Sequence, residues 1–217
     1  ADALDGYRGP HDSIWSQEFY ETGEERDFVR GFTYETTRGR GAVATALTGV
    51  HSGRIPWGEG HHHAYRKLFN RIAGMVAICE DLPEEHNTVT LDPNLRDAHG
   101  IPAPKMTYSI SDNSQKMLDF AVARASETLL AAGAEDLIIE SPLAAGGWHL
   151  MGTARMGVNP QKSVVNEWGR SHDVKNLFVV DGSIFVTSAG GNPTRTIQTL
   201  ALYITDQMKK RLTQLFD

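Results

Sequence analysis

Several short apolar runs along the 217-residue chain are bounded by turn residues, which is the pattern of buried strands. They predict strands at residues 75–79, 88–91, 106–110, 137–139 and 177–180. Before residue 75 the pattern is irregular and rich in loops, and it predicts only a strand at 28–36 and a short helix at 65–75. Most of the regular structure is therefore expected after residue 74.

Two later segments show the 3.6-residue period of amphipathic helices. In the first, apolar residues recur at three- and four-residue spacing over residues 118–132. Asp112 and Gln115 have the spacing of a capping box at its start, and Gly133 marks its end. The second helix is predicted to start at Pro193, because the N–H that proline lacks would be unpaired at the first helical position. Its apolar stripe is Ile197, Leu200, Ala201, Ile204, Met208, Leu212 and Leu215.

Together these elements predict an α+β fold, and the chain length suits one large domain or two small ones. We expect residues 1–140 to form a first part with a sheet and flanking helices, of which residues 1–74 are irregular. Residues 141–217 are expected to form a second segment that ends in a strand, a glycine-rich turn and the last helix.

Charge and composition exclude some functions. The chain has 21 basic and 27 acidic residues, and this net charge of −6 disfavours nucleic-acid binding, which needs a basic face. No apolar run approaches the roughly 20 residues that span a bilayer. The single cysteine, Cys79, lies in an apolar run and is expected to be an inert core thiol.

The start of the chain bears on its origin and location. A lone cysteine and the lack of a signal-like N-terminus favour a cytoplasmic location. The chain opens on Ala1 rather than methionine, which indicates a natural subunit, a cleavage product or a piece of a longer protein. A periplasmic location therefore stays open.

Two segments after residue 140 have the composition of a ligand site. In the first, Gly146, Gly147 and Gly152 surround His149, a candidate general base whose alternative is an ordinary structural histidine. In the second, residues 179–194, a strand ends in Asp-Gly and a glycine-rich turn leads to a helix N-terminus, which favours anionic or electron-rich ligands. A tight connection with nothing bound is the alternative there. No HExxH or CxxC spacing is present, so no metal site is predicted.

Four motifs together resemble the C-terminal signature of the glucose–methanol–choline (GMC) flavoprotein oxidoreductases. They read HLMGTARMG (149–157), SVV (163–165), NLFVVDGSIF (176–185) and GGNPTRT (190–196). The run at 80–108 also resembles the substrate domain of that family. The resemblance therefore implies that residues 1–140 are a substrate-binding domain and that residues 141–217 are the catalytic, FAD-contacting segment. The resemblance is strong over residues 75–210 and weak over residues 1–48.

One feature of that family is not found in this chain. Its members begin with a Rossmann unit whose GxGxxG turn holds the FAD pyrophosphate. The nearest match here, GRGAVA at 39–44, follows polar residues (TYETTR) rather than a buried strand. The resemblance therefore implies that an N-terminal FAD-binding half comes from another chain, a cleaved partner or a further part of the polypeptide.

The resemblance implies FAD-dependent oxidation of an alcohol or a sugar hydroxyl, with the hydride passing to flavin N5. It places the base at His149 and the carboxamide that orients the hydroxyl at Asn192. N–H groups at the start of the last helix would stabilise negative charge on the reduced flavin. The implied cofactor-contacting residues are Trp148, Asp181, Gly182, Asn192, Pro193 and Thr194.

A polar and aromatic cluster in the loop at 49–63 has the chemistry of a sugar site, and a plain surface loop is the alternative. The candidate substrate residues in it are Trp57, Glu59, His62 and His63. Two other functions stay open: a flavin-containing hydroxynitrile-lyase-like enzyme, and a non-catalytic carbohydrate-binding subunit. Anaerobic flavin reduction by an alcohol or sugar separates the oxidoreductase from the lyase. The effect of His149→Ala on turnover separates an enzyme from a binding subunit.

Overall fold

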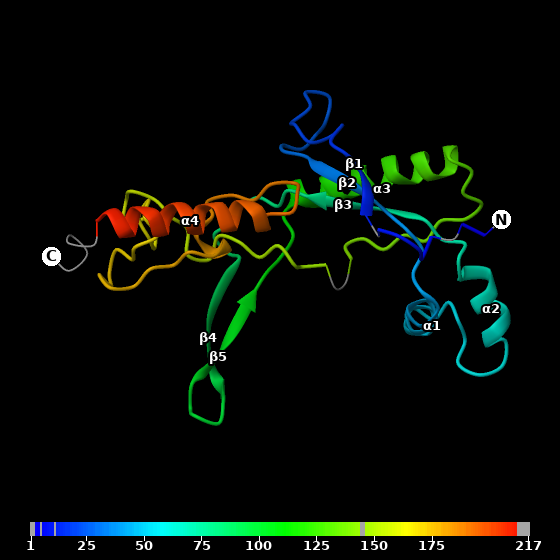
Figure 1. Cartoon of the computed structure of the whole chain (residues 1–217), viewed down its shortest axis with the longest axis horizontal. Helices are drawn as coiled ribbons and strands as arrows, with labels where there is room; N and C mark the ends of the chain where they lie inside the picture. The colour runs from blue at the N-terminus through cyan, green and yellow to red at the C-terminus, as the bar shows by residue number, and fades with distance from the viewer. Residues whose placement is uncertain (1–2, 5, 11, 144–145, 212–217) are drawn as a thin grey trace. The chain divides into compact units, whose positions relative to one another are not determined.

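A computed structural model describes residues 3–4, 6–10, 12–143 and 146–211 of the chain (Figure 1). The chain forms two compact units, each assembled from separate stretches of sequence. The first unit contains residues 1–26, 30–78 and 117–141, and the second contains residues 27–29, 79–116 and 142–217. Helices and small sheets occur together, so the predicted α+β class is confirmed. The expected functional division at residues 140 and 141 stays a prediction.

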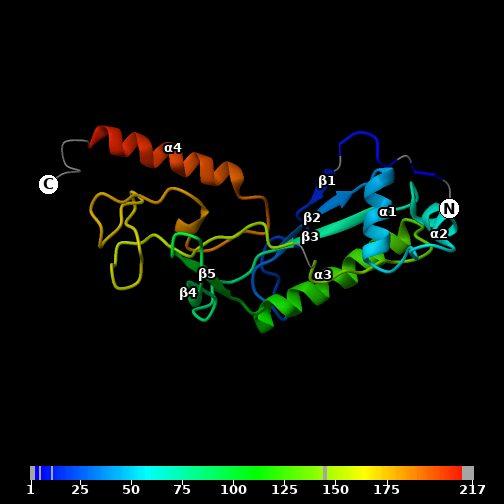
Figure 2. The ribbon, with the colours of Figure 1, turned by 90° about the horizontal axis from the view of Figure 1, so that it is seen from below.

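A three-stranded sheet in the order β1-β2-β3 organises the first unit (Figure 2). Strand β1 (Asp12–Ser16) pairs antiparallel with β2 (Phe32–Thr37), with Trp15 opposite Glu35. The predicted strand at 28–36 thus begins four residues late, because Arg30 has a φ of 70° and interrupts the extended backbone. The prediction for 75–79 is confirmed by β3 (Gly74–Cys79).

The central strand β2 carries the aromatic core of the first unit. The ring of Phe32 lies 5.5 Å from that of Phe19 and 5.0 Å from that of Tyr34. Phe120, from helix α3 (Asp112–Ala131), lies 5.4 Å from Phe19, and the Tyr34 hydroxyl donates to the carbonyl of Ala121 at 2.5 Å. These contacts hold α3 against the sheet, because aromatic side chains supply a large buried area.

The ends of α3 test two sequence predictions. The capping residue is Ser111 rather than Asp112, since the Ser111 hydroxyl accepts the N–H of Ser114 at 3.2 Å. At the other end, Gly133 has a φ of 95°, and the N–H of Ala134 reaches the carbonyl of Leu129 at 3.0 Å. This Schellman arrangement confirms the predicted glycine stop. The apolar run at 137–139 that follows forms no strand in the described structure.

Two helices follow β2 in the first unit, α1 (Ala42–His51) and α2 (His61–Leu68). Sequence analysis missed α1, and it placed the helix at 65–75 too late, because β3 already begins at Gly74. Within α1, Gly49 makes room for the fully buried Ile55, whose Cδ1 would lie 2.3 Å from an added Cβ. Helix α1 is therefore marked by its close packing on Ile55 and not by a periodic apolar pattern.

The segment GRGAVA at 39–44 lies in a strand–turn–helix connection, contrary to the expectation that no buried strand precedes it. Strand β2 ends at Thr37, and its first four residues are buried. A Cβ added to Gly74 would lie 2.8 Å from Thr37 Oγ1, and one added to Gly39 would lie 2.9 Å from the Ile72 carbonyl. The end of β2 thus lies beside the start of β3, so these strands run antiparallel. The parallel βαβ unit of a dinucleotide-binding fold is not formed here.

A β-hairpin belongs to the second unit (Figure 1). It pairs β4 (Thr88–Arg96) with β5 (Pro102–Thr107), and Val89 lies opposite Met106. The predicted strands at 88–91 and 106–110 are thus confirmed in type, but β5 lies several residues earlier than expected. Val89, Leu91 and Met106 lie on one face of the hairpin and are 50%, 69% and 71% exposed.

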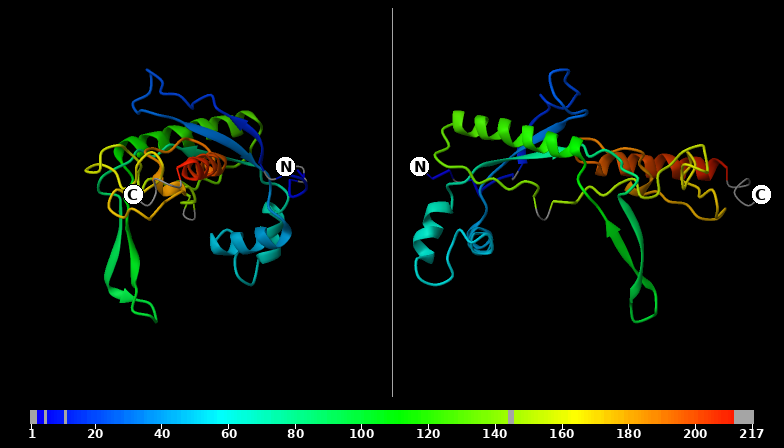
Figure 3. Two further views of the ribbon diagram at one scale, coloured as in Figure 1. Left: turned by 60° about the vertical axis from the view of Figure 1, so that its left-hand side comes forward. Right: turned by 180° about the vertical axis from the view of Figure 1, so that it is seen from behind.

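The C-terminal part of the second unit packs on helix α4 (Thr194–Lys210), which lies along the loops before it (Figure 3). Pro193 precedes the helix as its cap, one residue from the predicted place. Ile204 forms a fully buried cluster with Val165 and Ile184, and Met208 packs against it. The predicted apolar stripe is thus confirmed in its described part, whereas Leu212 and Leu215 lie outside the described residues.

The run at 177–180 was predicted to be a strand, and this prediction is wrong. Phe178 makes only an isolated bridge with Arg170, and Val179 and Val180 continue as irregular backbone packed on the core. Burial, rather than ladder pairing, explains the apolar run. Within the described residues, none of the helices combines the length and the apolar character needed to span a bilayer.

Candidate active site

A short backbone ladder joins the two segments that carry the predicted chemistry. The N–H groups of Gly152, Ala154 and Met156 donate to the carbonyls of three consecutive residues, Gly182, Ser183 and Ile184, at 3.2, 2.8 and 2.8 Å. Alternate residues of the segment 152–156 thus meet one turn of 3-10 helix, η1 (Gly182–Ile184). The histidine motif and the Asp-Gly-Ser motif therefore form one structural element.

Glycines at two positions permit this close approach. Gly152 has a φ of 84°, and a Cβ added there would lie 3.2 Å from the carbonyl oxygen of Phe185. A Cβ added to the buried Gly182 would lie 3.2 Å from Cδ1 of Ile197 and 3.3 Å from the carbonyl oxygen of Leu150. The first turn of α4 thus packs on η1 through Ile197. The backbone of Leu150, the residue after His149, also lies against η1.

Asp181 caps η1. Its Oδ1 accepts the N–H of Ser183 at 2.8 Å. Hydrogen bonds from the hydroxyl and the backbone N–H of Ser183 lower the pKa of Asp181 below its usual value. The side chain is therefore a carboxylate near neutral pH, and it holds the turn whose carbonyls receive the backbone ladder.

A second set of contacts fixes the end of the histidine motif. The N–H of Gly157 donates to Val165 at 2.8 Å, and the N–H of Val164 donates to the Arg155 carbonyl at 3.0 Å. Nε2 of His172 lies 3.0 Å from both the Gly157 carbonyl and the Ser163 hydroxyl. The half-buried His172 thus has a structural role that its sequence position did not indicate.

The two predicted catalytic residues lie on segments that this packing brings together. His149 is half-buried between Trp148 and Leu150, which are 70% and 72% exposed. Asn192 is exposed and lies two residues before the first residue of α4. Among the described residues, the first turn of α4 contains no acidic residue, and its cap residue Pro193 makes no side-chain capping hydrogen bond. Its N–H groups are therefore suited to an electron-rich ligand.

The predicted substrate residues belong to the first unit. Trp57 is 88% exposed, and Glu59 is exposed on the same loop. His62 and His63 lie in the first turn of α2, so the expectation of a loop is wrong for them. Their role in substrate binding stays a prediction. Among the described residues, no three His, Cys, Asp or Glu side chains are grouped to hold a metal ion.

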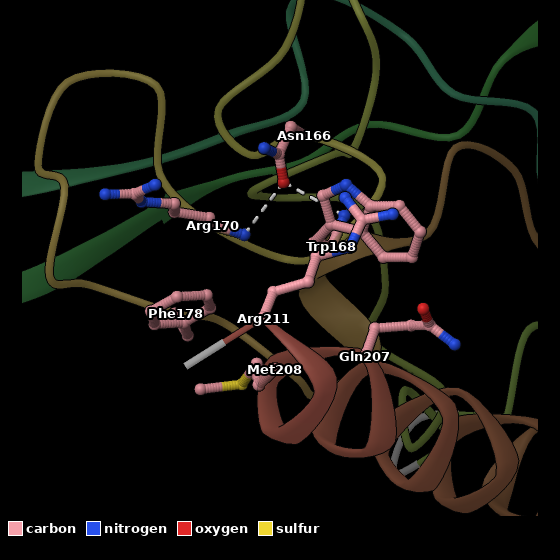
Figure 4. A pocket seen from close by; sticks show the side chains of 7 residues that line it. All are labelled: Asn166, Trp168, Arg170, Phe178, Gln207, Met208 and Arg211. Carbon is pink, nitrogen blue, oxygen red and sulfur yellow. Dashed lines mark hydrogen bonds between the residues drawn. The ribbon is translucent and has the colours of Figure 1, made fainter. Parts of the chain in front are cut away.

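A hollow of about 100 Å³ lies near the other end of α4 (Figure 4). The guanidinium of Arg211 lies 4.0 Å from the centre of the Trp168 ring, which is the geometry of a cation–π contact. Seventeen residues at 1.5 Å each make α4 about 25 Å long. This hollow is therefore separate from the segment that carries Asn192.

Sequence analysis missed a polar network at the end of β3. Asp81 accepts the Tyr108 hydroxyl on Oδ2 at 2.6 Å and the Ser114 hydroxyl on Oδ1 at 2.5 Å. Its carbonyl oxygen accepts the Ser188 hydroxyl at 3.0 Å, and the neighbouring buried Glu80 accepts the Thr187 hydroxyl at 3.4 Å. The sequence signal was the pair of adjacent acidic residues directly after an apolar run, because a carboxylate that is buried requires hydrogen-bond partners.

The carboxylate of Asp81 also affects its neighbours. Partial desolvation of the hydroxyl and the hydrogen bond to Asp81 raise the pKa of Tyr108 above its ordinary value. The phenol therefore stays a hydrogen-bond donor throughout the neutral range. Burial, with a smaller contribution from the charge of Asp81, raises the pKa of the Cys79 thiol to about 12.

We expect Cys79 to resist alkylation in the native protein. The thiolate is the reactive form, and an ordinary cysteine has a pKa of about 8.5, so a pKa of about 12 lowers the thiolate fraction at pH 8 by about a thousandfold. Iodoacetamide modification, followed by mass spectrometry in buffer and in denaturant, measures this difference. Native and denatured rates within a factor of about ten would contradict the expected burial.

Comparison with known proteins gives a family match over more than half of the chain. A family model described as GMC oxidoreductase matches residues 83–201. The chain is 39% identical over 220 residues to 2-methyl-1,2-propanediol dehydrogenase of Mycolicibacterium austroafricanum, and the match covers 99% of this chain and 39% of that protein.

Other relatives match shorter parts of the chain. It is 39% identical over 126 residues to 6'''-hydroxyparomomycin C oxidase of Streptomyces lividus, covering 58% of this chain and 23% of that protein. It is 32% identical over 140 residues to the fructose dehydrogenase large subunit of Gluconobacter japonicus, covering 64% of this chain and 26% of that protein. The chain therefore spans well under half the length of each of these relatives.

Proposed function

Because the chain belongs to the GMC oxidoreductase family, we propose that it is the C-terminal part of an FAD-dependent enzyme that oxidises hydroxyl groups. The observation that carries this proposal is the backbone ladder from residues 152–156 to Gly182, Ser183 and Ile184. It supports a single site because it joins the motif of His149 to the turn that packs on α4. The relatives named above include a diol dehydrogenase and a sugar dehydrogenase, which supports an alcohol or a sugar as substrate.

The residues at the start of α4 fit a flavin. In the described part of the chain the cap residue Pro193 makes no side-chain capping hydrogen bond, and the dipole of a 17-residue helix favours negative charge at that end. Trp148 is 70% exposed next to His149, which leaves its ring available to pack on an aromatic cofactor. Asp181 is already engaged with Ser183, so its cofactor contact would be to a hydroxyl or N–H group rather than to phosphate.

When bound, FAD supplies the acceptor for the hydride that leaves the alcohol carbon. His149 takes the hydroxyl proton on an unprotonated ring nitrogen, because imidazole exchanges protons near neutral pH. The Asn192 carboxamide hydrogen-bonds the hydroxyl oxygen and fixes the orientation of the alcohol. It cannot accept the proton itself at neutral pH, so the two residues have distinct roles.

We further propose that the rest of the FAD-binding domain, including its Rossmann half, comes from polypeptide outside these 217 residues. The greater length of the relatives supports this, since the chain covers 39% of the diol dehydrogenase. Apolar side chains that such a domain would cover are exposed in each unit. Val43 and Leu47 on α1 are 73% and 66% exposed, and Leu150 beside His149 is 72% exposed.

Anaerobic flavin reduction tests the proposed function. The flavin-loaded protein that contains this chain is mixed without oxygen with a vicinal diol, with fructose or with a long-chain alcohol. We expect at least one of them to bleach the oxidised flavin spectrum, because hydride transfer needs no oxygen. Release of cyanide from a cyanohydrin with no bleaching by any hydroxyl compound would instead favour the lyase-like function.

A further inference from the structure

The acidic pair Glu80–Asp81, just after β3, is hydrogen-bonded to the turn that leads to Asn192, and we propose that Asp81 is a positioning residue for the Asn192 carboxamide. This inference rests on the proposed function, in which that carboxamide orients the alcohol. All the residues involved belong to the second unit.

The carboxylate of Asp81 is fixed at both oxygens. Oδ2 accepts the hydroxyl of Tyr108, which follows β5, at 2.6 Å. Oδ1 accepts the hydroxyl of Ser114, in the first turn of α3, at 2.5 Å. Ser114 is 5% exposed, so water has little access to compete with its hydrogen bond to Asp81. Hydrogen bonds to a charged acceptor are stronger than those between neutral groups, and two of them hold the Asp81 peptide in one orientation.

The backbone of Asp81, held in this way, is hydrogen-bonded to the turn before α4. The carbonyl oxygen of Asp81 accepts the Ser188 hydroxyl at 3.0 Å. The side chain of Glu80, which is 6% exposed, accepts the Thr187 hydroxyl at 3.4 Å. Two consecutive residues after β3 thus hold two consecutive residues of the turn.

The rest of the turn depends on such anchors. Between Ser188 and Asn192 the chain contains Ala189, Gly190 and Gly191, none of which has a side chain long enough to fix the backbone. Gly190 is buried and Asn192 is exposed. Thr187–Ser188 and the start of α4 are therefore fixed points on either side of Asn192, and Asp81 holds the first of them.

Hydrogen exchange tests the anchor without relying on activity. In Tyr108→Phe and Ser188→Ala variants of the flavin-loaded protein, we expect the peptide over 186–193 to exchange at least about threefold faster. Peptides over 152–157 should stay unchanged. Tyr203→Phe is the matched control, because it removes a phenolic hydroxyl from the exposed face of α4. Ser188→Thr keeps the hydroxyl and should restore slow exchange.

Rapid anaerobic kinetics test the consequence for catalysis. We expect Tyr108→Phe and Ser188→Ala each to slow flavin reduction by about tenfold, because a carboxamide displaced by a fraction of an ångström aligns the alcohol poorly. The substrate Kd and the flavin content should change less than twofold. The double variant should lose little more than either single variant, since both act through Asp81.

The outcomes are distinct. Unchanged exchange over 186–193, or flavin reduction within twofold of wild type in both variants, overturns the positioning role of Asp81. Additive losses, or losses matched by a fall in flavin content, overturn it in favour of a general structural role. If no hydroxyl compound reduces the flavin although exchange responds as expected, the proposed function fails, and with it the catalytic role of the anchor, while the anchor itself stands.

Discussion

His149→Ala is expected to lower kcat/KM for the alcohol substrate by about two to four orders of magnitude, the usual contribution of a general base. The variant leaves the hydroxyl proton without an acceptor, while Asn192 and the start of α4 are unchanged. Flavin content should stay close to that of wild type, because His149 lies outside the backbone ladder of residues 152–156. Steady-state kinetics and the flavin spectrum measure the two effects separately.

Two further variants identify the role of the imidazole. His149→Gln keeps a polar side chain of similar length but cannot accept the proton at neutral pH, so we expect nearly the same loss. His99→Ala changes an exposed histidine in the hairpin turn between β4 and β5 and should leave the kinetics unchanged. A loss below about tenfold would leave the base unassigned and favour a binding subunit.

Ile204→Ala is expected to destabilise the protein by about 2–5 kcal/mol. Ile204 is fully buried with Val165 and Ile184, so its truncation removes apolar contacts and leaves a cavity. The same helix begins next to Asn192, so we also expect weaker flavin retention. Urea unfolding followed by circular dichroism measures the change in the free energy of unfolding.

Leu202→Ala is the matched control for this core variant. Leu202 lies two residues earlier on α4 but is 74% exposed, so truncating this isomeric side chain to alanine should cost within about 0.5 kcal/mol. Equal destabilisation by the two variants would mean that the exposed face of α4 is covered in the intact protein as fully as the inner face. A cost for Ile204→Ala below about 1 kcal/mol would contradict the packing of the cluster.

Periodicity predicted the long elements well and the short ones unevenly. Helices α3 and α4 were predicted because an amphipathic stripe repeats over several turns, and the glycine stop at Gly133 was read directly from the residue type. The run at 177–180 misled because a buried run has the same composition whether or not a neighbouring strand pairs with it. Helix α1 was missed because it buries Thr45 and Gly49 and exposes Val43, the reverse of the usual pattern.

The sequence by itself determined the family and located the candidate site segments, because the motifs at 149–157 and 176–196 are local strings whose order and spacing are directly visible. Only the tertiary structure decided which distant residues meet. The three hydrogen bonds to Gly182, Ser183 and Ile184, and the contacts of Asp81 with Tyr108 and Ser188, join residues about 30 to 110 positions apart. Such pairings depend on how the elements pack in three dimensions, so they cannot be predicted from the spacing of residues along the chain.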